Sequence, residues 1–189
     1  MRRITALTPE EAPAKSAELL TELITRRGTA GEMVSTMAHS PAVLQGYLEF
    51  SRAMKRAKLP RPLSEKISLA AQEWIGCGTC LAAHTAAAKA AGLTDTDIAL
   101  ARQGTSTDAR EAALIAFALR VLAEPSSLGD DDIAELRAHG WSDRIIAEIP
   151  ALIALNQLTG TFNLAIGLEP APASGNSPGS IMNEGGQGG

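Results

Sequence analysis

The sequence predicts an all-α protein, on three observations. Apolar residues make up 45% of the 189 residues but aromatic residues only 3%, so the core must consist mainly of Ala, Leu and Ile, which suit closely packed helices better than strands. Helix-capping residues stand repeatedly in front of segments with apolar residues at helical spacing. No segment alternates polar and apolar residues in the way that marks a half-buried strand.

Capping and helix-breaking residues place eight expected helices along the chain. Ser, Thr and Asp accept hydrogen bonds from the free N–H groups at a helix start, Pro fits the first turn, and Gly often ends a helix. We expect a first helix from about Thr8 to Arg26, opened by TPEE and ended by the glycines of RRGTAGE. The next three expected helices run from Ser40–Pro41 up to KLPRP, from near Leu63–Ser64 to Gly76, and from Cys77 to Ala91. Two more run from Thr94 to the next glycine and from Thr107 or Asp108 to before Pro125. The last two lie within GDDDIAELRAHG and from Ser142 onwards, the latter with a kink at Pro150.

Charge and hydropathy argue against two kinds of partner. The net charge is −4, so we expect no basic face for nucleic-acid phosphates. The N-terminal stretch MRRITALTPEEAPAKSAELL has arginines but no apolar run, which makes it a poor secretory signal. No stretch reaches the ~20 consecutive apolar residues that a membrane span needs. We therefore expect a soluble, cytoplasmic protein that binds neither nucleic acid nor a membrane.

The composition changes near Glu169. The remaining sequence, EPAPASGNSPGSIMNEGGQGG, is rich in Pro, Gly and Ser and almost devoid of core residues. Such a segment buries too little apolar surface to offset the entropy lost on ordering. We expect one helical domain over residues 1–168 and a disordered tail over residues 169–189.

The residues with the most reactive side chains gather in GCGTCLAAHTAAAKAAG, residues 76–92. At about 100° per residue, Cys80 lies about 60° and His84 about 20° from Cys77 around a helix axis, so the three share one face. The start of a helix favours the thiolate form of cysteine, and imidazole can hold or pass a proton near neutral pH. The spacing assembles a reactive thiolate, a second thiol that can resolve it, and a proton carrier.

Other interpretations of the cysteines stay open at this point. Two thiolates and one imidazole would supply three zinc ligands, but no fourth ligand is evident. His39 and His139 stand at helix boundaries and are expected to be surface or capping residues. The aspartates of GDDDIAELRAHG suit the positive end of a helix dipole better than a metal. A permanent disulfide is unusual in the cytoplasm, and an inert buried pair of cysteines is the remaining alternative.

Two carboxylates compete for the place beside the thiols and His84. Glu65 stands twelve residues before Cys77, and Glu73 stands four before it. Either side chain could orient the imidazole or accept a proton through water. Spacing alone does not choose between Glu65 and Glu73.

Three further residues near these elements could be functional or structural. Trp74, next to the dithiol, is expected in the core or in a subunit interface rather than against a substrate. Asn156 and Asn163 are seven residues apart on an apolar helix and so share a face. We expect both amides to be satisfied in the core or an interface, with a place at the mouth of a pocket as the alternative.

The arrangement Glu65-x11-Cys77-x2-Cys80-x3-His84 resembles the AhpD-like alkylhydroperoxidase branch of the carboxymuconolactone decarboxylase superfamily. SEKISLAAQEWIGCGTCLAAHTAAAKAAGLTDTDIALARQG resembles the core helix pair of that family and the short helix after it, and weaker similarity extends over about residues 8–168. The resemblance implies an AhpD-like helical bundle with the CxxC motif at the N-terminus of a core helix. It also implies a subunit that forms homo-oligomers.

The resemblance further implies a role for each residue of the motif. Cys80 would attack the peroxide and Cys77 would resolve the product. His84 and Glu65 would form a proton relay, so Glu65 is preferred to Glu73. No metal, haem or flavin cofactor would be required.

We therefore predict a thiol-dependent peroxidase that reduces organic hydroperoxides and is restored by a dithiol protein or a small thiol. The best-studied type of this family has a histidine where Thr79 stands, a difference that bears on peroxidase efficiency and on the reductant. One alternative is a carboxymuconolactone decarboxylase-like enzyme acting on a small lactone, although that branch generally lacks the dithiol. The other alternative is a non-catalytic member of the fold.

Overall fold

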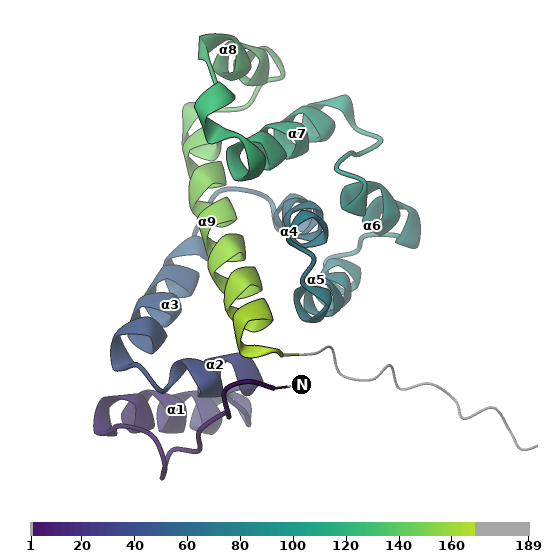
Figure 1. Ribbon diagram of the computed structural model, residues 1–189. Helices are drawn as coiled ribbons and strands as arrows, with labels where there is room; N and C mark the ends of the chain where they lie inside the picture. The colour runs from purple at the N-terminus through teal and green to yellow at the C-terminus, as the bar shows by residue number, and fades with distance from the viewer. Residues whose placement is uncertain (1, 169–189) are drawn as a thin grey trace, which may run out of the picture.

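The computed structural model describes residues 2–168, and within that range every regular element is a helix, as predicted (Figure 1). The expected tail, residues 169–189, lies outside the described residues, so the domain boundary stays a prediction. The elements are α1 (Ala14–Arg27), α2 (Glu32–Met37), α3 (Pro41–Met54), α4 (Arg61–Ile75), α5 (Gly78–Ala90), α6 (Asp95–Arg102), α7 (Ala109–Ala123), the 3₁₀ turn η1 (Pro125–Ser127), α8 (Asp130–Ala138) and α9 (Asp143–Ile166).

The predicted side-chain caps are confirmed for α3, α6, α7 and α9. Each cap oxygen accepts a hydrogen bond from an N–H group in the first turn of its helix, a group that has no partner within the helix. Thr94 forms a capping box with Asp97, whose carboxylate accepts from the Thr94 backbone N–H at 3.0 Å. The four caps are Ser40, Thr94, Asp108 and Ser142.

The predicted start of the first helix is wrong. The helix begins at Ala14 rather than at Thr8. Pro13 disfavours helical dihedral angles at the residue before it, so the segment that opens at Thr8 makes one turn and stops. In that turn the Thr8 carbonyl accepts from the N–H groups of Glu11 and Ala12 at 3.2 and 3.1 Å.

Two further differences concern short or proline-containing helix segments. Helix α4 begins at Arg61 rather than near Leu63, because Pro62 lies in the first turn, where its missing N–H costs no helical hydrogen bond. Helix α2 was not predicted. It has only six residues, too few for apolar periodicity to reveal it.

Helix α4 lies at the centre of the main core. It packs against α5, α6, α7 and α9, and eight of its fifteen residues are buried. Because α4 is covered on so many sides, it fixes the helices that carry the cysteines and their neighbours. The fully buried side chains of this core include Leu63, Ile67, Leu114, Ile115, Leu136, Ile149 and Ile153.

A smaller core joins the N-terminal helices to the far end of α9. Leu20, Met37 and Leu44, from α1, α2 and α3, are buried together, and Phe162 of α9 packs against them. Figure 1 shows α1–α3 gathered at one end of α9 and α7–α8 at the other. Helix α9 is thus the element that connects both cores.

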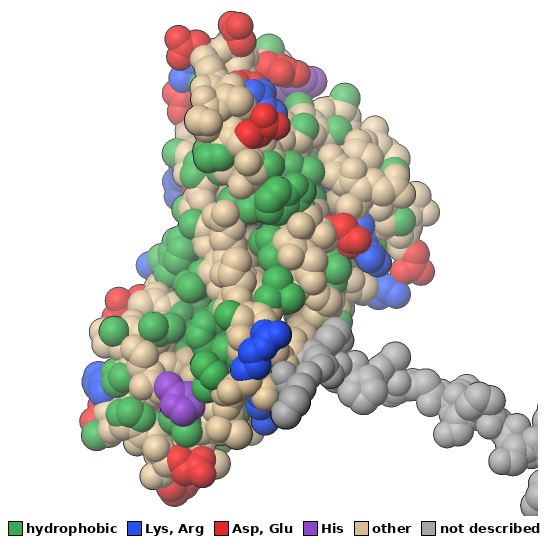
Figure 2. All heavy atoms as spheres, in the orientation of Figure 1, with side chains coloured by type: hydrophobic (Ala, Val, Ile, Leu, Met, Phe, Trp, Pro, Cys, Tyr) green, Lys and Arg blue, Asp and Glu red, His purple; other side chains and the backbone are tan. Residues whose placement is uncertain are grey.

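Helix α9 is continuous through Pro150, an exposed residue in its interior. By length and composition alone it would also be long and apolar enough to cross a membrane. It packs against α3, α4, α5, α7 and α8, and a third of its apolar window is buried by that packing. Figure 2 shows hydrophobic side chains along the middle of one face of the molecule, and acidic side chains at the end formed by α8.

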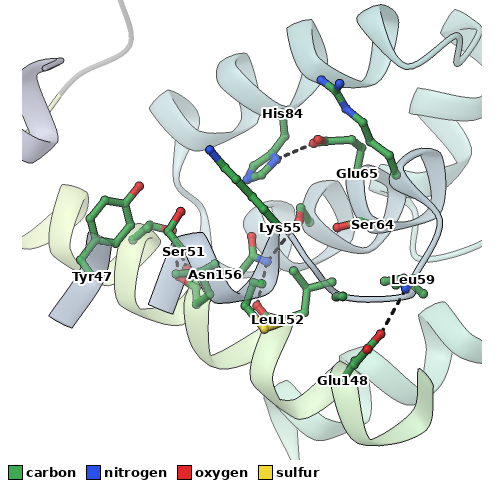
Figure 3. A pocket seen from close by; sticks show the side chains of 16 residues that line it. Tyr47, Ser51, Lys55, Leu59, Ser64, Glu65, His84, Glu148, Leu152 and Asn156 are labelled. Atoms are coloured by element: carbon green, nitrogen blue, oxygen red, sulfur yellow. Dashed lines mark hydrogen bonds and ion pairs between the residues drawn. The ribbon is translucent and has the colours of Figure 1, made fainter. Parts of the chain in front are cut away.

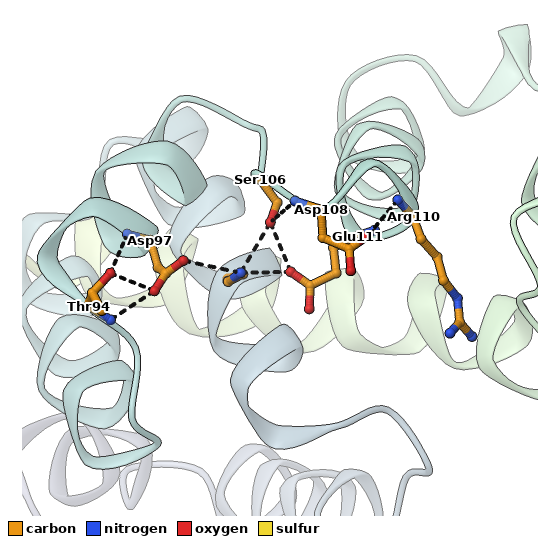
Figure 4. A network of polar contacts seen from close by, with 7 residues as sticks. Thr94, Asp97, Ser106, Asp108, Arg110 and Glu111 are labelled. Carbon is orange, nitrogen blue, oxygen red and sulfur yellow. Dashed lines mark hydrogen bonds and ion pairs between the residues drawn. The ribbon is translucent and has the colours of Figure 1, made fainter.

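A buried lysine ties α4 to the α6–α7 region. Lys66 is 6% exposed, and its ammonium group donates to Glu111 Oε2 at 2.7 Å and to Ser106 Oγ at 3.1 Å. Asp97 lies 3.7 Å away, and Figure 4 shows these contacts together. A buried charge is tolerated only when it is paired and hydrogen-bonded in this way.

Candidate active site

The CxxC motif lies at the turn between α4 and α5. Gly76 ends α4 with φ of 80°, a left-handed conformation that a glycine adopts without steric cost. Cys77 then takes the N-cap position of α5, and its Sγ accepts a hydrogen bond from the Cys80 backbone N–H at 3.3 Å. Both sulfurs therefore lie at the positive end of the α5 dipole, where negative charge on sulfur is favoured.

Cys77 and Cys80 form a disulfide in this structure, with their Cα atoms 5.3 Å apart. That separation is within the range that a disulfide requires. Cys77 is 1% exposed and Cys80 is 6% exposed. The motif can therefore hold the oxidised pair without rearrangement of the backbone, and Cys80 is the more accessible of the two.

A carboxylate from α4 contacts the imidazole of α5. Glu65 Oε2 lies 2.8 Å from His84 Nδ1, and both side chains are partly buried, at 15% and 29% exposure. An ionised carboxylate can only accept a hydrogen bond, so Nδ1 carries the proton of this contact. In the neutral imidazole Nε2 is then left as an acceptor.

The structure brings Glu65, not Glu73, to His84. Glu73 accepts a hydrogen bond from Arg102 Nε at 2.7 Å on the exposed side of α4. This contact raises the pKa of the Arg102 guanidinium. Sequence spacing left the choice open because the answer depends on which face of α4 meets α5.

Helix α9 adds a residue whose contact with sulfur the sequence did not reveal. Asn163 Nδ2 donates a hydrogen bond to Cys80 Sγ at 3.3 Å. Asn163 is 4% exposed, and its Oδ1 has no partner among the described residues. The buried amide therefore directs a donor at the more accessible sulfur.

The other predicted amide, Asn156, has structural partners. Its Nδ2 donates to Ser68 Oγ at 3.1 Å, and its Oδ1 accepts from Gln72 Nε2 at 3.0 Å. These contacts join α4 to α9. Asn156 also borders a cavity, so both interpretations of this residue, core amide and pocket residue, are confirmed.

A cavity of about 650 Å³ opens beside the Glu65–His84 pair (Figure 3). It lies between α3, α4, α5 and α9, and Glu65 and His84 are the residues of the motif that border it. Neither cysteine is among the described residues that line it. Its apolar wall consists of Met54, Leu59, Leu152 and Leu155, and its polar residues include Tyr47, Ser51, Lys55, Arg61, Ser64, Ser68 and Glu148.

The remaining sequence candidates lie apart from this site or at its edge. Trp74 is not in the core of the subunit, because 59% of it is exposed. His139 is the C-cap of α8 and His39 is exposed, as predicted. Thr79 donates a hydrogen bond to the Leu168 carbonyl at 2.9 Å. In residues 2–168 no three His, Cys, Asp or Glu side chains are grouped as metal ligands.

Comparisons with known proteins agree with the fold. The sequence profile of the Carboxymuconolactone decarboxylase family matches residues 41–124, from α3 to α7. Among curated proteins none is significantly similar to the chain in sequence.

Solved structures with the same fold include two peroxidase-related proteins and a debrominase. The AhpD-core protein of Ralstonia eutropha JMP134 is 22% identical, with a TM-score of 0.78 over 90% of this chain and 92% of that one. The protein from Silicibacter sp. TM1040 is 19% identical, with a TM-score of 0.74 over 88% and 92%. The debrominase Bmp8 is 21% identical, with a TM-score of 0.72 over 89% and 91%.

The helical fold and the CxxC motif at the start of α5 define the protein as an AhpD-like helical protein. Residues 41–124 are similar in sequence to the Carboxymuconolactone decarboxylase family, and the fold of the chain is the fold of the AhpD-core and peroxidase-related structures.

Proposed function

We propose that the protein is a thiol-dependent peroxidase that reduces organic hydroperoxides through Cys80 and Cys77. The observation that carries the proposal is the Glu65–His84 hydrogen bond of 2.8 Å, one helical turn from a cysteine pair able to form a disulfide. A nucleophile, a resolving group and an oriented proton carrier are the parts that this chemistry needs.

Cys80 is proposed as the attacking cysteine. It is more accessible than Cys77, and the Asn163 amide donates to its sulfur. Hydrogen bonds to the charged form lower the pKa of an acid, so Asn163 would increase the thiolate fraction of Cys80. The same side of α5 carries His84, which can accept the thiol proton at Nε2.

The reaction proceeds in three balanced steps. The Cys80 thiolate attacks the distal oxygen of ROOH, the O–O bond breaks, and Cys80 becomes a sulfenic acid while RO⁻ takes the proton held by His84. The Cys77 thiol then attacks the sulfenic sulfur, which forms the disulfide and releases water. An external dithiol restores both thiols by exchange and becomes a disulfide itself.

The role of Glu65 is to orient the imidazole of His84 and to stabilise its positive charge when it is protonated. Its carboxylate fixes the tautomer of His84 with Nε2 free, and it stabilises the imidazolium that forms when the thiol proton arrives. We further propose that the enzyme acts in the cytoplasm as a homo-oligomer, with a dithiol protein or small thiol as reductant.

Thiol counting tests the proposal. One equivalent of hydroperoxide added to the reduced protein should convert two titratable thiols to none, with no disulfide between chains. The product is checked by non-reducing electrophoresis and mass spectrometry. Two thiols still titratable after treatment would contradict peroxidase activity.

The likeness to a debrominase favours a second candidate, reductive debromination of an aromatic ring. A dithiol can supply the two electrons, since Ar–Br and two thiols give Ar–H, HBr and a disulfide. Bromide release from a bromopyrrole by the reduced protein, measured against the rate of hydroperoxide consumption, distinguishes the two candidates. A reaction on a small lactone that survives Cys80→Ser would instead indicate the decarboxylase-like alternative.

A further inference from the structure

We propose that the cavity beside His84 binds an amphipathic organic carboxylate, with the carboxylate at its cationic rim and the apolar part against α9. Identifying that ligand with the substrate, as a hydroperoxide that carries a carboxylate, rests on the peroxidase function proposed above. The binding site itself is argued from the residues of the cavity alone.

Two cations border the cavity without a carboxylate partner among residues 2–168. Lys55 follows the last residue of α3, and Arg61 is the first residue of α4. Both are exposed, and neither takes part in any ion pair of the described residues. Arg52, Arg56 and Lys58 are also without an ion pair among those residues, but Lys55 and Arg61 are the cations of this stretch that line the cavity. In Figure 3 the Lys55 side chain extends across the cavity toward His84. Lys55 and Arg61, at the two ends of the loop that joins α3 to α4, therefore place two unpaired positive charges at the border of the cavity.

The two acidic residues that line the cavity already have hydrogen-bond partners within the protein. Glu65 is bonded to His84. Glu148 Oε2 accepts from the backbone N–H groups of Lys58 and Leu59 at 2.8 and 3.1 Å, and Arg144 Nε lies 3.3 Å from its Oε1. Because these carboxylates have hydrogen-bond partners of their own, neither forms an ion pair with Lys55 or Arg61, and both cations remain available to an anion from outside.

The rest of the cavity suits an apolar chain rather than a small polar ion. Met54, Leu152 and Leu155 form one wall, and the lining residue Tyr47 also packs against the core of the N-terminal helices. Burial raises the pKa of Tyr47 further above neutral pH, and the neutral phenol can donate a hydrogen bond. A volume of about 650 Å³ falls in the range of sites for organic ligands.

Calorimetric titration with two probes of equal length tests the site. Decanoate should bind the reduced protein, and decanol should bind about tenfold more weakly because it lacks the charge that Lys55 and Arg61 recognise. The double variant Lys55→Gln/Arg61→Gln should lose about tenfold in affinity for decanoate while its affinity for decanol changes little. Helix content by circular dichroism confirms that the variant is folded.

The matched control is Arg52→Gln/Lys58→Gln. It removes the same charge from the same stretch of chain, but neither residue lines the cavity. Its affinity for decanoate should equal that of the unaltered protein. Equal losses in the two double variants would show attraction by net charge alone and would overturn the site.

The substrate assignment is tested separately with linoleic acid hydroperoxide and its methyl ester. The ratio of kcat/KM for acid over ester should exceed one and should fall about tenfold in Lys55→Gln/Arg61→Gln. If decanoate binds as predicted but neither hydroperoxide oxidises the thiols, the peroxidase function fails and the carboxylate site stands. If both hydroperoxides are reduced equally and decanoate does not bind, the site fails and the peroxidase function stands.

Discussion

Glu65 and Lys66 are neighbours on α4 but lie in two different polar regions. Glu65 faces the cavity and bonds to His84, a group that can gain or lose a proton near neutral pH. Lys66 points to the other side of the helix, where Glu111 and Ser106 surround its ammonium group. In the first region the side chain that can change its charge, His84, is 29% exposed, whereas in the second the charged Lys66 side chain is only 8% exposed.

This difference indicates that the Glu65 region serves the proposed reaction and that the Lys66 region stabilises the fold. At the Lys66 region the ammonium group is paired with Glu111 of α7 and lies near Asp97 of α6, so its contacts hold α4, α6 and α7 together. At the Glu65 region the partner of the carboxylate can change its charge, and a cavity gives a small molecule access to it. Substitutions in the two regions should therefore affect different measurements.

The largest effect is expected at the Lys66 region. Glu111→Ala should lower the free energy of unfolding by about 3 kcal/mol, because it leaves a buried ammonium without its closest carboxylate. Urea denaturation measures the change, with the exposed Glu135→Ala as the control. A loss of less than about 1 kcal/mol would show that Asp97 and water can replace Glu111. Thiol oxidation at a temperature where the variant is folded should be unchanged.

The next effect is on rate rather than stability. Glu65→Gln should slow oxidation of the thiols by hydroperoxide about 100-fold, because the amide cannot stabilise an imidazolium at His84. The matched control is Glu73→Gln, which changes the other carboxylate of α4 and leaves His84 untouched. Stopped-flow fluorescence gives both rates. Equal rates for the two variants would remove Glu65 from the mechanism.

Asn163→Leu should have a smaller effect at the same site. The substitution removes the donor to Cys80 Sγ, so the pKa of the Cys80 thiol should rise by about one pH unit. The rate of alkylation by iodoacetamide, followed against pH, measures the change, with the exposed Gln157→Leu on the same helix as the control. Because the thiolate fraction recovers at higher pH, the rate deficit should vanish in alkaline solution; a deficit that persists there would indicate a structural defect instead.

The smallest effect is expected at Asp97. The hydrogen bonds of Thr94, and to a lesser degree the charge of Lys66, lower the pKa of the Asp97 carboxyl group. A carboxyl group whose pKa is lowered in the folded state adds stability at pH values above its ordinary pKa of about 3.9. This contribution is lost as the pH falls through the lowered pKa. Asp97→Asn should reduce stability slightly at neutral pH and not at strongly acidic pH, whereas Asp95→Asn should change neither.

The sequence predicted the helices where local signals decide the structure. Ser40, Thr94 and Ser142 cap their helices because a side-chain oxygen and the N–H groups it accepts from are close in sequence. The start of α1 was misplaced because Pro13 outweighed a good cap at Thr8. Local rules conflict in such a stretch, and the stronger steric rule prevails.

The site was predictable only in the part that lies on one helix. Cys77 is the N-cap of α5, and Cys80 and His84 lie within that helix, so their spacing in the sequence was enough to place them along one helix. The contact of Asn163 with sulfur needed the packing of α9 on α5, which spans 83 positions of sequence. The choice of Glu65 over Glu73 likewise depended on the face of α4 that meets α5.

The central claim is that Cys80 is the nucleophile and Cys77 the resolving thiol. The most direct measurement compares Cys77→Ser and Cys80→Ser in single-turnover oxidation, with dimedone labelling and mass spectrometry to locate any sulfenic acid. Cys77→Ser should react rapidly with one equivalent of hydroperoxide and carry a dimedone adduct at Cys80, whereas Cys80→Ser should react no faster than a free thiol. Rapid oxidation of Cys80→Ser, or slow oxidation of both variants, would contradict the assignment.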